Sequence, residues 1–257
     1  MARIFVTGSS DGLGLLAAQQ LVKNGHNVTI HARNEQRAKD AHAACPGAKA
    51  VLVADLSSMA QTKQLAEDAN ASGPFDCVIH NAGIFRGGFR STEEGLPSLV
   101  AVNVMAPYIL TCLMRRPRRL VFLSSDSHYS GNGSVDDVTW QERGEQGWSD
   151  SRAYSDSKLY NNFFANAFSR RWPDVKSNSL DPGWMPTKMG GRSAPGDFKR
   201  SVETYVMLAE GEGDGNTTGK YFEPGKRQGK PNPAANDEKA QEKLMKVCEK
   251  VTGVSPP

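Results

Sequence analysis

Short apolar runs alternate with longer stretches of helical periodicity along the whole chain. The apolar runs lack an internal alternation with polar residues, which is typical of strands buried on both faces of a sheet. The longer stretches place apolar residues three and four positions apart, as amphipathic helices do. We expect strands at 4–7, 28–31, 50–54, 77–80, 120–123, 177–180 and 220–222. We expect helices at 13–24, 34–44, 58–71, 97–115, 151–171, 199–209 and 237–250.

This alternation predicts an α/β fold. Parallel strands joined by right-handed helical crossovers give a doubly wound parallel sheet with helices on both faces. No repeat and no change of composition marks a second unit, so a single domain is expected over 1–257. Segments 126–150, 184–198 and 223–236 are irregular, and the first two follow strand ends, where open α/β sheets bind ligands. We therefore expect the substrate side at about 126–150 and 184–210.

The first expected strand runs into a turn with three glycines, Thr7-Gly-Ser-Ser-Asp-Gly-Leu-Gly14. Gly8 allows a tight exit from the strand, Gly12 a close approach of backbone to a pyrophosphate, and Gly14 tight packing of the following helix. The amino-terminal amides of that helix and its positive dipole end would face the phosphates. The spacing matches the generic dinucleotide fingerprint only loosely, so a purely structural turn remains an alternative at this point.

Tyr154 and Lys158 lie four positions apart at the start of an expected helix, which places them on one face. Free tyrosine titrates at about 10, and a neighbouring ammonium favours the phenolate. We therefore expect Lys158 to lower the pKa of Tyr154 and to make it a general acid and base. An exposed helical pair is the alternative, because the spacing alone also arises by chance.

Polar or small residues follow several expected strands. Ser124 and Ser125 follow 120–123, Asn81-Ala-Gly83 follows 77–80, and Asp181-Pro-Gly183 follows 177–180. Carboxyl ends of parallel strands meet at one edge of a sheet, as a dinucleotide cleft requires. Asn103 lies in an otherwise apolar helix, where a buried amide needs a partner. It is either part of the site or a satisfied core residue.

Composition narrows the classes of function. A net charge of +3 is too small to indicate nucleic acid or a membrane surface as a partner. The four cysteines are widely spaced and the five histidines show no ligand spacing, so we expect free thiols and no metal site. The longest apolar stretch, 99–114, is interrupted by Asn103 and Pro107 and is too short for a membrane span. No leader pattern opens the chain, which favours a cytoplasmic protein.

Jointly these motifs resemble the classical short-chain dehydrogenase/reductase family, with its Rossmann-type fold, from Arg3 to about Thr187. The resemblance implies a catalytic tetrad of Asn103, Ser125, Tyr154 and Lys158. It also implies cofactor contacts from the glycine turn, the strand ends and the catalytic helix, at Gly8, Ser10, Asp11, Gly12, Leu13, Gly14, Asp55, Leu56, Asn81, Ala82, Gly83, Tyr154, Lys158, Pro182, Gly183 and Thr187.

Within the family, the segments 121–128 and 181–189 look most like the retinol dehydrogenase and light-dependent protochlorophyllide reductase branch. The separation of 29 positions between Ser125 and Tyr154 is longer than in many classical members and resembles that branch. Two departures are apparent. The membrane anchor of many retinol dehydrogenases is missing, and the segment from Asn103 to Leu120 is short for the dimer-forming surface seen in the family. Dimers and tetramers are common in this family, so a homo-oligomer remains open.

The residue that follows the second expected strand helps to distinguish NADP(H) from NAD(H) as the cofactor. An acidic residue there would accept hydrogen bonds from a ribose 2′-hydroxyl and repel a 2′-phosphate. The chain instead has His31-Ala-Arg33, and the Arg33 guanidinium suits a phosphate. We therefore expect NADP(H) as cofactor over NAD(H). The alternative for Arg33 is a surface cation at the start of a helix.

We expect an NADP(H)-dependent oxidoreductase that reduces a ketone or aldehyde, or oxidises the corresponding alcohol. Tyr154 would protonate the alkoxide, Ser125 would hold the carbonyl oxygen, and Asn103 would hold a water that connects Lys158 to solvent. Five apolar residues line the pocket for a bulky apolar substrate or merely pack the irregular segments: Trp140, Trp148, Trp184, Met185 and Met189. A double-bond reductase or epimerase of the same fold, and a catalytically silent dinucleotide sensor, are the alternatives.

Overall fold

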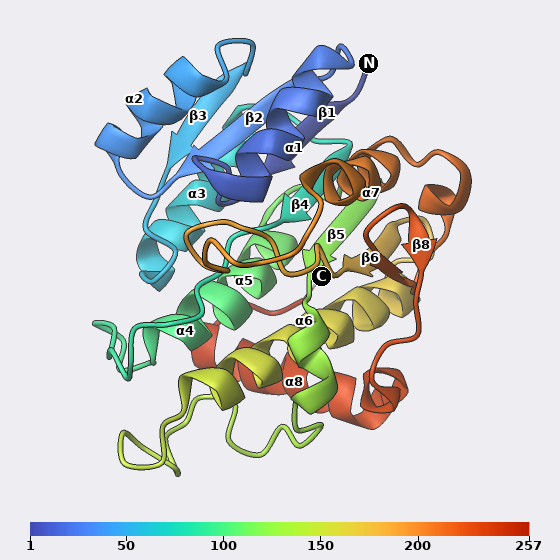
Figure 1. The fold of residues 1–257 in the computed structure, drawn as a ribbon. Coiled ribbons are helices and arrows are strands. Elements are labelled where there is room, and N and C mark those ends of the chain that lie inside the picture. The colour runs from blue at the N-terminus through green and yellow to red at the C-terminus, as the bar shows by residue number, and fades with distance from the viewer. Residues whose placement is uncertain (257) are drawn as a thin grey trace.

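The computed structural model describes residues 1–256, and its strands form one sheet. The strand order is β3-β2-β1-β4-β5-β6-β7-β8, in which β1 to β7 are parallel and β8 runs antiparallel to β7 (Figure 1). The strands are β1 Arg3–Val6, β2 Asn27–Ala32, β3 Ala50–Val53, β4 Cys77–His80, β5 Arg119–Leu123, β6 Lys176–Leu180, β7 Tyr221–Glu223 and β8 Arg227–Gln228. The doubly wound parallel sheet is confirmed, and β8 is an antiparallel addition at its edge.

Helices cover both faces of the sheet, as predicted (Figure 1). One face carries α1 Gly12–Lys23, α2 Glu35–Ala44 and α7 Phe198–Glu210. The other carries α3 Met59–Ala71, α4 Ser98–Val100, α5 Ala106–Leu113, α6 Asp150–Arg171 and α8 Glu238–Thr252. In this second layer α8 packs on α6, so α6 is covered on the side away from the sheet. Among residues 1–256, no helix has both the length and the apolar character that crossing a bilayer requires.

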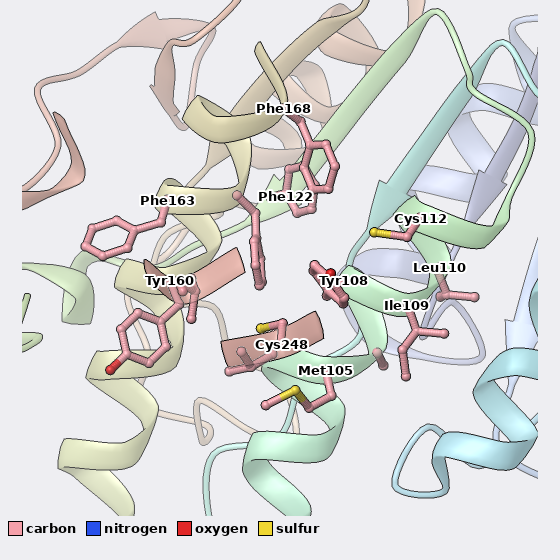
Figure 2. Close-up of a cluster of buried hydrophobic side chains, with 14 of the residues drawn as sticks. Met105, Tyr108, Ile109, Leu110, Cys112, Phe122, Tyr160, Phe163, Phe168 and Cys248 are labelled. Atoms are coloured by element: carbon pink, nitrogen blue, oxygen red, sulfur yellow. The ribbon is translucent and has the colours of Figure 1, made fainter. Parts of the chain in front are cut away.

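The larger core lies between the sheet and the α5–α6 layer (Figure 2). Phe122 of β5 stacks on Phe168 of α6 with the ring centroids 6.0 Å apart, and Phe163 on the same helix is fully buried. Each such aromatic side chain removes a large apolar area from water. Burial of apolar surface stabilises the fold by about 25 cal/mol per Å². This packing holds α6 rigidly against β5 and β6. The catalytic candidates of α6 are therefore mounted on a stiff element.

The structure interrupts the helix expected at 97–115. The three-residue α4 is followed by a π-helical turn, Ala101–Met105, and then by α5. Asn103 lies in the middle of the π-helical turn. Single π turns inside helices often occur at functional sites, because the extra residue redirects a side chain. A periodicity argument does not detect one inserted residue.

The irregular segments 126–150 and 223–236 contain short 3₁₀ helices, Asp126–Ser130 and Pro233–Asn236, and a further 3₁₀ helix, Gly213–Asn216, lies between α7 and β7. The order of the strands reverses between β1 and β4, which are parallel neighbours: β1 to β3 extend the sheet toward one edge, and β4 to β8 extend it toward the other. In open α/β sheets, ligands bind beside such a switch point at the carboxyl ends of the strands. The four cysteines are buried free thiols, as expected.

Candidate active site

The glycine turn is locked against the end of β4. Gly8 has a φ of +60°, and a Cβ there would lie 2.7 Å from Ala82 Cα. Asn81 Nδ2 donates to the carbonyls of Thr7 and Gly8, each at 2.9 Å, and its Oδ1 accepts a hydrogen bond from Tyr205. The side chain of Asn81 is therefore occupied in shaping the turn, and Ala82 backs the turn directly.

Past this contact the turn is open. Gly12 also has a positive φ, +56°, and a Cβ there would approach only Thr187 Cγ2, at 3.7 Å. Asp11 precedes α1 without a side-chain cap bond, and its carboxylate pairs with Arg37 and with Lys188 Nζ. The α1 amino terminus thus presents unbonded amides beside Thr187, which suits a pyrophosphate.

Lys158 is buried beneath Tyr154. Its Nζ lies 5.4 Å from the Tyr154 ring centroid and donates to the Leu123 carbonyl at 2.9 Å. Burial lowers the pKa of Lys158 to about 8, while the Asp181 charge opposes this shift. A Cβ at Gly83 would lie 3.3 Å from this Nζ. The ammonium is thus hydrogen-bonded at the end of β5 and lies close to Gly83, which follows β4.

The expected acidification of Tyr154 is wrong. Burial raises the pKa of Tyr154 to about 12, and a side-chain hydrogen bond with Ser125 offsets only part of this rise. Lys158 lies under the ring and bonds to a carbonyl instead of meeting the phenol oxygen. Tyr154 is therefore a neutral phenol near pH 7, which is the form that donates a proton.

Ser125 and Tyr154 are brought together as expected. Ser125 caps the 3₁₀ helix Asp126–Ser130: its Oγ accepts from the Ser127 amide at 3.2 Å and donates to Asp126 Oδ1 at 3.0 Å. The Ser125 hydroxyl also reaches the Tyr154 hydroxyl. One serine hydroxyl therefore lies between the end of β5 and the phenol.

Asn103 is satisfied within the protein. Its Oδ1 accepts from the Ile84 amide at 2.8 Å, and its Nδ2 donates to the Ile84 carbonyl at 2.9 Å and to Ser157 Oγ at 3.1 Å. Both amide protons are used, so a water could use only the second lone pair of Oδ1. A Cβ at Gly83 would lie 3.5 Å from this Oδ1, so Asn103 and Lys158 flank Gly83 from two sides.

The remaining cofactor candidates lie along the same edge. Arg33 is exposed at the end of β2 and makes no ion pair with residues 1–256. Asp55 Oδ1 accepts from the Ser57 amide and hydroxyl, and Leu56 is buried. The Pro182–Gly183 turn follows β6, with a φ of +81° at Gly183. Sequence reasoning missed Arg37, whose guanidinium binds Asp11 in the glycine turn.

Asp181 is a second residue that sequence reasoning left without a role. It is 7% exposed, its Oδ1 accepts from the Gly183 amide at 2.7 Å, and its Oδ2 lies 3.5 Å from the Tyr221 hydroxyl. Burial raises the pKa of Asp181 to about 6. The sequence signal that could have identified Asp181 is an acidic residue at a strand end, directly before Pro182-Gly183.

This burial makes a prediction for stability. The folded-state pKa of Asp181 lies above its unfolded value, so ionisation penalises the folded protein increasingly as the pH rises through about 6. Asp181→Asn removes that penalty. We expect the variant to gain on the order of 1–2 kcal/mol relative to wild type between pH 5 and pH 8, measured by urea unfolding. An equal difference at both pH values would contradict a buried, ionising carboxyl.

The segment after β6 links the two halves of the site (Figure 1). Thr187 faces Gly12, Lys188 pairs with Asp11, and Met189 Sδ lies 3.9 Å from the Tyr154 hydroxyl. Phe85, also missed from the sequence, packs its ring on that of Tyr154 with the centroids 4.7 Å apart. The segment from Thr187 to Met189 therefore contacts both the glycine turn and the Tyr154 hydroxyl.

The five apolar pocket candidates divide into two groups. Trp140 and Met185 are buried in packing, and Trp148 packs edge-on against Trp140, so these three support the irregular segments. Trp184 and Met189 are 56% and 40% exposed. Of the five, Met189 directly contacts the Tyr154 hydroxyl.

The comparisons with known proteins identify the family. The family model for short chain dehydrogenase matches residues 2–197. The chain is 48% identical over 257 residues to the short-chain dehydrogenase chyC of Penicillium rubens, with 100% of both chains covered. It is 27% identical over 292 residues to human retinol dehydrogenase 13, covering 99% of this chain and 85% of that protein.

Solved structures share the fold. A protein from Mycobacterium Paratuberculosis superposes with a TM-score of 0.84 at 23% identity, covering 100% of this chain and 95% of that one. A blue fluorescent protein from a metagenomic library, solved in complex with NADPH, superposes with a TM-score of 0.69 at 22% identity, covering 88% and 97%. The chain therefore belongs to the short-chain dehydrogenase family of oxidoreductases, as a classical member related to the retinol dehydrogenase branch.

Proposed function

We propose that this protein is an NADP(H)-dependent reductase of a ketone or aldehyde carried by a bulky apolar substrate. The observation that carries the proposal is the convergence of Ser125, Tyr154 and buried Lys158 beside the open glycine turn. A hydroxyl pair next to a turn suited to pyrophosphate is what carbonyl reduction by a dinucleotide requires.

The residues present fit such a cofactor. Gly12 leaves space over the α1 amino terminus, and Thr187 closes that space from the far side. Ser10, Asp11 and Leu13 complete the turn, and Gly83, Pro182 and Gly183 supply backbone along the same edge. Lys158 would bind the ribose next to the nicotinamide, by family resemblance. Bound NADPH supplies the hydride that reduces the carbonyl carbon.

The protein's own groups handle the proton. Ser125 Oγ donates a hydrogen bond to the substrate carbonyl oxygen and holds it against Tyr154. The Tyr154 hydroxyl then transfers its proton to the developing alkoxide. Burial keeps Tyr154 protonated, which is the form that reduction needs, while alcohol oxidation would need the phenolate. Lys158 beneath the ring returns a proton to the site, with Asn103 holding the water that leads to solvent.

Arg33 and its surroundings support NADP(H) over NAD(H). The guanidinium is exposed and pairs with no carboxylate among residues 1–256, so it is available to a 2′-phosphate. The carboxylate of Asp11 in the glycine turn is paired with Arg37 and Lys188. These two cations weaken its electrostatic repulsion of a phosphate.

The cofactor assignment predicts a change of selectivity. Arg33→Asp should raise the Kd for NADPH at least about tenfold and leave NADH binding nearly unchanged, because only NADPH carries the 2′-phosphate. Titration of protein fluorescence with each nucleotide measures both constants. Lys39→Asp makes the same change of charge at an exposed position of α2 and serves as the control. Equal losses in the two variants would show a general charge effect and refute the assignment.

The apolar substrate is supported by Phe85 and Met189, which contact Tyr154, and by exposed Trp184. A panel of ketones, aldehydes and activated alkenes, followed by loss of NADPH absorbance, tests the function. Oxidation of NADPH with bulky carbonyls supports the proposal. Turnover of alkenes alone would indicate a double-bond reductase, and binding without turnover across the panel would indicate a sensor.

A further inference from the structure

His128 lies three residues after Ser125 and has no direct part in the chemistry above. It is fully buried in the middle of the 3₁₀ helix Asp126–Ser130, which Ser125 caps. The carbonyl oxygen of Ser125 accepts two hydrogen bonds from this one residue, from the His128 amide at 3.0 Å and from Nδ1 at 2.5 Å. His128 therefore fixes, by two hydrogen bonds, the backbone of the serine that would hold the substrate carbonyl.

The second ring nitrogen fixes the tautomer. His128 Nε2 lies 3.0 Å from the backbone amide of Asn232, which can only donate. Nε2 must then be the unprotonated acceptor, so Nδ1 carries the proton and donates to the Ser125 carbonyl. Burial lowers the pKa of His128, although the Asp126 and Glu223 charges oppose this shift, and the ring stays neutral at neutral pH. The rings of Tyr129 and Tyr221 pack against the imidazole.

A segment about a hundred residues away holds the imidazole in place. Asn232 Nδ2 donates to the carbonyls of His128 and Tyr129, both at 3.3 Å, and the Tyr129 hydroxyl donates to the Lys230 carbonyl at 2.7 Å. Asn232 Oδ1 in turn caps the 3₁₀ helix Pro233–Asn236. The Ser125 side chain itself bonds only to its near neighbours Asp126 and Ser127 and to Tyr154. The rigid link from Ser125 to the rest of the fold therefore includes His128.

We propose that His128, as the Nδ1–H tautomer selected by Asn232, is a positioning residue that sets the Ser125 hydroxyl for the substrate carbonyl. The inference rests on the proposed function, because it assigns Ser125 a substrate to hold. In this role His128 acts through the backbone carbonyl of Ser125. Misplacing a substrate-holding group by about 1 Å can lower a rate about 100-fold.

A double-mutant cycle tests this role. We expect His128→Phe and Ser125→Ala each to lower kcat by about 100-fold with a carbonyl substrate, while the Kd for NADPH stays within about twofold. In the double variant we expect no further loss, because His128 has no serine left to position. Losses that multiply in the double variant would show that His128 acts elsewhere, as a general structural residue, and would overturn the proposal.

Two conservative variants keep the test decisive where His128→Phe fails to fold. In His128→Asn, the amide nitrogen can replace Nδ1 and still donate to Ser125. In His128→Gln, the longer side chain reaches the Nε2 position and replaces the acceptor for Asn232. We expect His128→Asn to keep kcat within about fivefold of wild type and His128→Gln to lose about as much as His128→Phe. The reverse order would overturn the proposal.

The cycle also separates this inference from the proposed function. If Ser125→Ala and Tyr154→Phe leave carbonyl reduction intact, the proposed function fails. Ser125 then has no role in catalysis that His128 could assist. If Ser125→Ala is impaired and folded His128→Phe is not, the function stands and only the positioning role fails.

Discussion

Tyr154→Phe is expected to lower kcat for carbonyl reduction by a factor of about 10² to 10⁴, the range that a positioned general acid contributes. The variant removes one oxygen from a half-buried ring that packs on Phe85 and lies over Lys158, so the packing is kept. NADPH binding should stay within a few fold, because the loss affects proton transfer. Steady-state kinetics and a fluorescence titration with NADPH measure the two effects separately.

Tyr160→Phe is the matched control. Tyr160 lies on the same helix, and its hydroxyl donates to the Ser134 carbonyl at 3.0 Å, away from Ser125 and Lys158. The control loses one hydrogen bond, about 1 kcal/mol of stability, and should keep full kcat. Full activity in Tyr154→Phe, or an equal loss in both variants, would remove the general acid from the mechanism.

Gly8→Ala should produce the largest loss of stability among single substitutions near the glycine turn. The positive φ of Gly8 costs an alanine about 1–2 kcal/mol, and its Cβ would lie 2.7 Å from the Ala82 backbone. Backbone cannot move aside as a flexible side chain does, so β1 and β4 would have to separate at the turn. We expect a total loss of at least about 3 kcal/mol in urea unfolding and no stabilisation by added NADPH.

Gly25→Ala separates the two causes. Gly25 also has a positive φ, +86°, but no heavy atom lies within 4 Å of the position of its Cβ. It should lose only the backbone cost of about 1–2 kcal/mol and should still be stabilised by NADPH. If both alanine variants are equally stable, the close approach of the turn to Ala82 contributes nothing.

Strand and helix positions followed well from the periodicity of the chain. The expected helix at 237–250 is α8, Glu238–Thr252, and the strand at 77–80 is β4, Cys77–His80, without change. Periodicity works here because each element buries one continuous face. It failed at 97–115, where one π-helical turn places Asn103, and it gave no signal for the two-residue strand β8.

The site divides in the same way. Motif spacing identified Ser125, Tyr154 and Lys158, and the structure brings these three side chains together. Spacing did not determine their protonation. An ammonium four positions away suggested an acidified phenol, yet burial under neighbouring groups dominates and raises the pKa of Tyr154. Desolvation depends on every atom around a group, and no local sequence pattern records it.

By itself, the sequence determined the α/β alternation, the glycine turn and the order of the candidate catalytic residues, because these depend on local spacing and on the chirality of parallel crossovers. Only the tertiary structure decided what surrounds them. It placed Asp181 in the site, laid Met189 over the Tyr154 hydroxyl, and joined His128 to Asn232 across 104 positions. Such contacts join residues far apart in the chain and leave no periodic trace in it, so they follow from packing alone.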